Sequence, residues 1–183
     1  MSLRQILGLT HADAALAHTD PALAHPLVAA VHERLAGLSL ERAKFVAAFA
    51  GLLTRVAFAD LEISPAERAT LQALLADKAG LTPDEASAVS AIVTHQATAL
   101  AGIDYAALTR VFNEIADAQK KEQLIDCLYA IATAQSTVSI AEDDQIRAVA
   151  NALFLSHEQF IAIRHRYKEQ LDIIQAMRQD YSR

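Results

Sequence analysis

An eleven-residue segment occurs twice in this chain, and the duplication constrains the fold more than any other feature of the sequence. The first copy covers residues 57–67 and reads AFADLEISPAE, and the second covers residues 132–142 and reads ATAQSTVSIAE. Five of the eleven positions are identical. Internal similarity at such a long period is typical of two copies of one supersecondary unit. We therefore expect a fold built from two related halves.

The composition favours helices over strands. Of the 183 residues, 53% are hydrophobic, whereas glycine and proline number only 5 and 4. Such a chain is rich in helix formers and poor in turn formers. Its length suits one domain with a sizeable core. The sequence predicts an all-α single domain of seven to eight helices, arranged as two pseudo-twofold repeats at about 40–100 and 104–179.

Capping boxes mark where four of the helices begin. In each box a serine or threonine is followed three residues later by a glutamate or glutamine, which can reach back to the amide of the cap residue. The four pairs are Ser64/Glu67, Thr82/Glu85, Ser139/Glu142 and Ser156/Gln159. Together with apolar residues at helical spacing, these boxes predict helices at roughly 26–36, 40–60, 65–79, 83–100, 104–117, 119–135, 140–154 and 157–179.

Three tight corners between helices share one form, which is a glycine, an apolar residue and an N-cap residue. Glycine tolerates the left-handed backbone that often ends a helix. The side chain of the cap residue can then accept from the free amides of the next helix. The three corners are Gly37-Leu38-Ser39, Gly80-Leu81-Thr82 and Gly102-Ile103-Asp104.

The N-terminal region differs from the rest of the chain. We expect residues 1–37 to form an arm with one short helix, and residues 38–183 to form the helical domain. Histidines recur in the arm every seven residues, but Pro21 and Pro26 prevent one straight helix through all of them. A histidine metal site needs converging ligands with supporting contacts, so a partly ordered, alanine-rich arm is the better interpretation. The histidines are His11, His18, His25 and His32.

Charge, hydropathy and cysteine usage exclude several classes of protein. The net charge of −6 argues against a nucleic-acid partner, because phosphate binding needs a basic face. The most apolar stretch, residues 45–54, is far shorter than the roughly 20 residues of a membrane span, and no signal peptide is visible. Cys127 is the only cysteine and lies among apolar residues at helical spacing, which predicts a buried structural thiol. We expect a cytoplasmic protein without an integral membrane segment.

The first copy of the segment holds a group of acids that could bind a metal. Asp60, Glu62 and Glu67 lie within eight residues, and hard divalent cations are held by such carboxylates. Ca²⁺ or Mg²⁺ suits them better than Zn²⁺. The loop is no EF-hand, because Pro65 stands where that loop needs its sixth-position glycine.

A structural explanation of the same acids stays open. Glu67 already belongs to a capping box, Asp60 suits the end of a helix, and Glu62 can simply face water. The second copy keeps Glu142, also as a cap, but it has Gln135 in place of Asp60 and Thr137 in place of Glu62. A metal site is therefore expected in the first copy rather than in the second.

No catalytic pattern accompanies these acids. The sequence has no glycine-rich phosphate loop, no His-Glu-x-x-His, no Cys-x-x-Cys and no nucleophile elbow. We expect a protein that is not an enzyme.

The duplicated segment resembles the TerB-like domains of tellurite resistance proteins. The family segment reads Ala-x-Ala-Asp-Gly-x-Ile-Ser-x-x-Glu and occurs twice, and here Leu61 stands in place of its glycine. The resemblance covers about residues 40–170. Gln135-Ser136 replaces Asp-Gly in the second copy, which is typical of a diverged branch of the family.

The resemblance implies an all-helical fold without enzymatic activity and a link to tellurite or other chemical stress. It also implies divalent-metal binding by Asp60, Glu67 and Glu142, to which the acidic loop itself adds Glu62. We further expect a protein partner or a homo-oligomer. The alternative is a protein–protein adaptor without a metal site, in which the acidic residues only cap helices.

Overall fold

The computed structural model describes residues 20–57, 64–99, 104–134 and 137–172. This part of the chain is all-α, as the sequence predicts, with eight α-helices and two short 3-10 helices. In chain order they are η1 (Pro21–Ala24), α3 (Pro26–Arg34), α4 (Leu40–Ala57), α5 (Pro65–Asp77), α6 (Pro83–Ala99), α7 (Tyr105–Ile115), α8 (Ala118–Ala132), α9 (Ile140–Ala152), α10 (His157–Arg166) and η2 (Lys168–Gln170).

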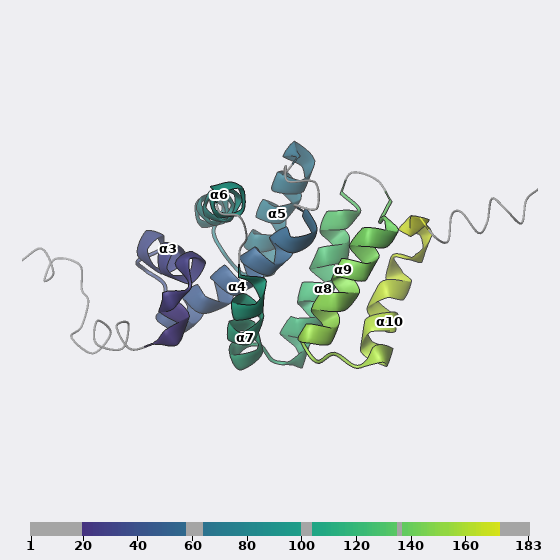
Figure 1. The fold of residues 1–183 in the computed structure, drawn as a ribbon. Helices are drawn as coiled ribbons and strands as arrows, with labels where there is room; N and C mark the ends of the chain where they lie inside the picture. Colours follow the sequence, from purple (N-terminus) through teal and green to yellow (C-terminus); the bar gives the residue numbers. More distant parts are fainter. Residues whose placement is uncertain (1–19, 58–63, 100–103, 135–136, 173–183) are drawn as a thin grey trace, which may run out of the picture.

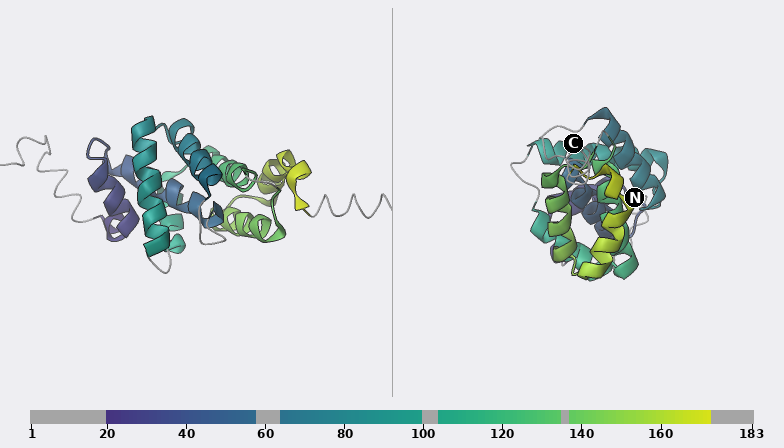
Figure 2. Two further views of the ribbon diagram at one scale, coloured as in Figure 1. Left: turned by 90° about the horizontal axis from the view of Figure 1, so that it is seen from above. Right: turned by 90° about the vertical axis from the view of Figure 1, so that its right-hand side faces the viewer.

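Helix α4 is the centre of the fold. It contacts α3, α5, α6, α7, α8 and α9. A helix that is apolar on nearly all sides is normally buried, and Phe49, Leu52 and Leu53 of α4 are almost completely shielded from solvent. Helices α3 and α6 lie toward one end of the molecule, and α8, α9 and α10 lie toward the other (Figures 1 and 2).

Gly51 lets α4 approach two of its neighbours closely. A Cβ atom at this position would overlap the Leu108 side chain of α7 and the Leu27 side chain of α3. Lys44 of α4 also links this helix to the start of η1, because its ammonium lies 2.5 Å from Asp20, the N-cap of η1, as well as 2.7 Å from Glu41 of α4. The short helix α3 is therefore packed against α4.

All four predicted capping boxes are present. The Ser139 amide donates to Glu142 at 2.8 Å, and the Ser156 amide donates to Gln159 at 2.9 Å. The boxes of α5 and α6 have the same geometry. Short-range signals thus set the starts of these helices, as the sequence predicts.

The corners differ in part from expectation. Gly80 has a φ of 61° and takes the left-handed conformation. Gly37 does not, because a turn with a 2.9 Å hydrogen bond from the Leu38 amide to the Leu35 carbonyl closes that corner instead. Gly102 lies outside the described residues. At the corner between α9 and α10, Phe154 is left-handed.

The last helix is shorter than predicted. The expected helix at 157–179 ends as α10 at Arg166, and η2 follows. The reason is a long-range contact: the Val138 amide donates to the Gln170 carbonyl at 2.7 Å, and the Asp172 amide donates to Val138 at 3.1 Å. This pairing buries Leu171 and is incompatible with a continuous helix. The predicted residues beyond 172 lie outside the described part.

Within the described residues, no helix combines the length and apolar character that crossing a membrane requires.

Candidate functional site

The first-copy acids are only partly described. Asp60 and Glu62 lie outside the described residues. Glu67 is the third residue of α5, where its Oε2 accepts from the Ser64 amide at 2.9 Å and its own amide donates to Ser64 Oγ at 3.2 Å. Glu67 is half-buried, and no lysine, arginine or histidine of the described ranges forms an ion pair with it.

The second-copy acid Glu142 has the same position at the start of α9. Its Oε2 accepts from the Ser139 amide at 2.8 Å and from Ser139 Oγ at 2.7 Å. Both described candidate ligands thus have a capping role. No group of three or more metal-ligating side chains is found among residues that the structure describes, so Glu67 and Glu142 belong to no such group there.

Asp143, next to Glu142, is the centre of a buried network that the sequence does not reveal. The Tyr129 hydroxyl donates to it at 2.7 Å, and Arg164 Nε lies 2.9 and 3.1 Å from its two oxygens. Arg147 Nη2 adds a longer contact of 3.4 Å. These side chains come from α8, α9 and α10, so the carboxylate joins three helices. The tyrosine ring also stacks on Tyr167, with 5.0 Å between centroids.

The network keeps fixed protonation states. Burial raises the pKa of Asp143, but the hydrogen bonds from Arg164 and Tyr129 and the charges of both arginines lower it by more, so the pKa lies below its ordinary value. Burial and the adjacent carboxylate raise the pKa of Tyr129. Asp143 is therefore ionised and Tyr129 neutral at physiological pH. With these partners in place, the network is suited to holding helices together.

Two other buried titratable side chains, Cys127 and His25, have structural roles. Cys127 is 1% exposed, as expected of a structural thiol, and burial raises its pKa to about 12. A thiol with this pKa is protonated at neutral pH and is a poor nucleophile. Burial also lowers the pKa of His25, whose Nδ1 accepts from the Leu27 amide at 3.2 Å as the N-cap of α3.

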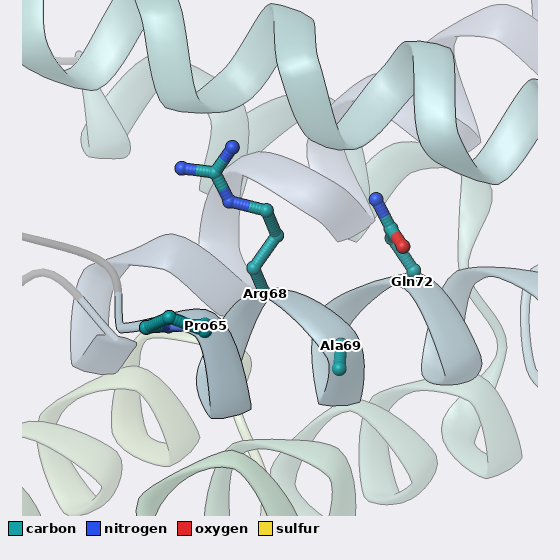
Figure 3. Close-up of a pocket in the computed structure, with 4 residues that line it drawn as sticks. All are labelled: Pro65, Arg68, Ala69 and Gln72. Atoms are coloured by element: carbon teal, nitrogen blue, oxygen red, sulfur yellow. The ribbon is translucent and has the colours of Figure 1, made fainter.

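Surface hollows lie at several places on the described helices, and three of them are lined as follows. The hollow on α5, of about 340 Å³, is lined by Pro65, Arg68, Ala69 and Gln72, which lie on one face of that helix (Figure 3). A second, of about 370 Å³, lies between η1 and α7 beside His25. A third, of about 140 Å³, lies at the corner between α9 and α10.

Comparison with known families gives a match over most of the described helices. The family model described as "Tellurite resistance protein TerB" matches residues 46–165. The matched region runs from α4 to α10 and contains both copies of the duplicated segment. No curated protein and no solved structure matches the chain.

Proposed function

Because this chain belongs to the TerB family of tellurite resistance proteins, we propose that it is a non-catalytic binding domain of a tellurite or related chemical-stress response. Its ligand is a divalent cation, taken at the acidic segment between α4 and α5. Asp60, Glu62 and Glu67 of the first copy supply the carboxylates, and Glu142 of the second copy serves only as a helix cap.

The carboxylate of Glu67 supports this proposal, because it lacks a cationic partner among the described residues. It is half-buried and accepts a hydrogen bond at Oε2. Its Oε1 has no hydrogen bond in that part of the chain, so the capping role leaves one oxygen for a ligand. A partly buried carboxylate is stabilised in its charged form by a nearby cation.

The second copy provides the contrast. There the neighbouring Asp143 already has two arginines and a tyrosine as partners, and Glu142 accepts two hydrogen bonds from Ser139. Gln135 and Thr137 stand where the first copy has Asp60 and Glu62. Ca²⁺ and Mg²⁺ prefer several carboxylate and carbonyl oxygens, which favours the first copy.

Calorimetric titration of the whole chain with Ca²⁺, Mg²⁺, Mn²⁺ and Zn²⁺ tests the proposal. We expect one site with a Kd below about 1 mM for Ca²⁺ or Mg²⁺. Asp60→Ala should weaken this binding at least tenfold. Equal affinity of Asp60→Ala and the unmodified chain would refute the site, as would affinities no better than millimolar for all four cations.

A second candidate function is protein–protein adaptation without a metal. The observation that favours it is a set of large apolar side chains that remain exposed: Ile140, Phe154 and Ile161 are 59%, 81% and 42% accessible. Burying such side chains against a partner protein is favourable. If the chain is an adaptor, its complex with a partner protein should form equally well after a chelator has removed Ca²⁺ and Mg²⁺. A complex with the partner protein that forms only in the presence of these cations supports the first proposal instead.

A further inference from the structure

The corner between α9 and α10 repeats the pattern of the glycine corners, with one substitution. Phe154-Leu155-Ser156 matches Gly80-Leu81-Thr82 in having a left-handed residue, an apolar residue and a hydroxyl N-cap. Gly80 and Phe154 both have a φ of 61°. Phenylalanine therefore occupies a backbone conformation for which the chain uses glycine elsewhere.

Phenylalanine is unfavourable at this position for the fold itself. A left-handed backbone brings Cβ close to the following carbonyl oxygen, which glycine avoids. Burial does not compensate, because Phe154 is 81% exposed. The surrounding backbone holds the conformation through bonds from the Phe154 amide to the Asn151 carbonyl at 3.0 Å and from the Leu155 amide to the Ala150 carbonyl at 3.1 Å. An unfavourable conformation maintained in this way points to a role outside the fold.

A hollow of about 140 Å³ lies directly beside the exposed ring. Its remaining lining comes from the start of α8 and from the same corner: Ala118, Lys121, Leu153, Leu155 and Gln159. A space of about 150 Å³ can accept one benzene-sized group. The corner thus presents an aromatic side chain and, next to it, a space that fits one.

Both a cationic and an anionic side chain lie near this corner. The Lys121 ammonium lies 5.9 Å from the centroid of the Phe154 ring. Glu158 is exposed on the first turn of α10. Neither Lys121 nor Glu158 forms an ion pair with any residue in the described ranges. The corner thus holds both members of two complementary pairs, which are a projecting ring with a hollow and a cation with an anion.

We propose that a second copy of this chain docks on this corner to form a twofold dimer. Twofold contacts use the same patch on both subunits, so the patch must complement itself. Each Phe154 ring fills the hollow of the other copy, and each Lys121 pairs with Glu158 of the other copy. The small patch makes the dimer weak and concentration-dependent. This inference goes beyond the proposed cation site and does not depend on it.

Sedimentation equilibrium of the full chain over a wide concentration range tests the dimer. We expect a monomer–dimer equilibrium with a Kd between roughly 10 µM and 1 mM. Phe154→Gly should weaken it at least tenfold and raise the melting temperature of the monomer by about 2–4 °C, since glycine relieves the backbone. Ile140→Ala, at the opposite end of α9, is the matched control and should leave the equilibrium unchanged.

Charge exchange tests the pairing across the twofold axis. Lys121→Glu and Glu158→Lys should each weaken the dimer, and the double variant should restore it. Restoration together with loss in Phe154→Gly supports the proposal. A chain that stays monomeric up to about 1 mM, or a dimer that Phe154→Gly leaves intact, overturns it.

Discussion

Asp143 illustrates how one residue can combine local and long-range roles. Its place in the first turn of α9 favours a negative charge, because the amides at a helix start are electropositive. Because Asp143 is only 7% exposed, its carboxylate also needs hydrogen-bonding partners inside the protein, and Tyr129 and Arg164 are these partners. Removing one member of a buried ionic group leaves the others uncompensated.

Replacing this carboxylate should therefore be costly. We predict that Asp143→Ala lowers the free energy of unfolding by about 3 kcal/mol, measured by urea denaturation. Asp144→Ala is the matched control, since its side chain is 64% exposed, and it should change stability by no more than about 0.5 kcal/mol. Similar effects of the two substitutions would show that the network contributes little.

The lowered pKa of Asp143 also predicts a pH dependence. A carboxyl whose pKa is lower in the folded state stabilises the fold above its unfolded pKa, near the ordinary value of 3.8. This contribution is lost as the pH falls through the folded-state value. The stability difference between the unmodified chain and Asp143→Asn should thus be constant near neutrality and shrink below about pH 4. A difference that stays constant down to pH 2 would contradict this assignment.

At the scale of elements, the sequence predicts helix starts better than helix ends. The four capping boxes are local, because each joins residues three apart, and all four form. The end of α10 depends instead on Val138, some thirty residues earlier, whose backbone pairs with Gln170 and Asp172. No local pattern contains that information, which is why the predicted helix at 157–179 is too long.

The backbone pairing of Val138 with Gln170 and Asp172 predicts that Leu171 holds the segment after α10 against the helices. Its side chain is 1% exposed, so Leu171→Ala should lower the free energy of unfolding by about 2–3 kcal/mol. Thermal or urea unfolding measures the change. Lys168→Ala, on the exposed part of η2, serves as control and should be nearly neutral. A neutral Leu171→Ala would indicate that this segment leaves α8–α10 in solution.

At the scale of the whole molecule, the fold depends on how closely helices approach α4. Gly51 permits the contact with α3 and α7 together. We predict that Gly51→Ala lowers the free energy of unfolding by about 1–3 kcal/mol, because the added methyl group displaces Leu108 and Leu27. Gly37→Ala is the control, since nothing lies within 4 Å of the added Cβ. Equal stability of the two variants would argue against this packing.

Sequence patterns reveal the parts of the candidate sites that depend on neighbouring residues, but not those that depend on distant ones. Glu67 and Glu142 are identifiable as caps because the box is local. The Asp143 network is not, because Tyr129 and Arg164 lie 14 and 21 residues away. The unusual position of Phe154 can be recognised from the sequence. The residues after it, Leu155 and Ser156, match those that follow the glycine in the glycine corners, and only the phenylalanine differs. Whether the two copies are related by a pseudo-twofold axis stays a prediction.

We propose that Glu67 and Glu142, which the two copies share, both cap helices, and that in the first copy Glu67 also binds a cation together with Asp60 and Glu62. Calorimetric titration of Ca²⁺ and Mg²⁺ into Glu67→Gln and Glu142→Gln separates cation binding from helix capping. Glutamine preserves the capping box, as Ser156 and Gln159 of this chain illustrate, so both variants should keep the melting temperature. We predict that Glu67→Gln weakens cation binding at least tenfold and that Glu142→Gln leaves it unchanged. Equal affinities of the two variants would contradict the claim.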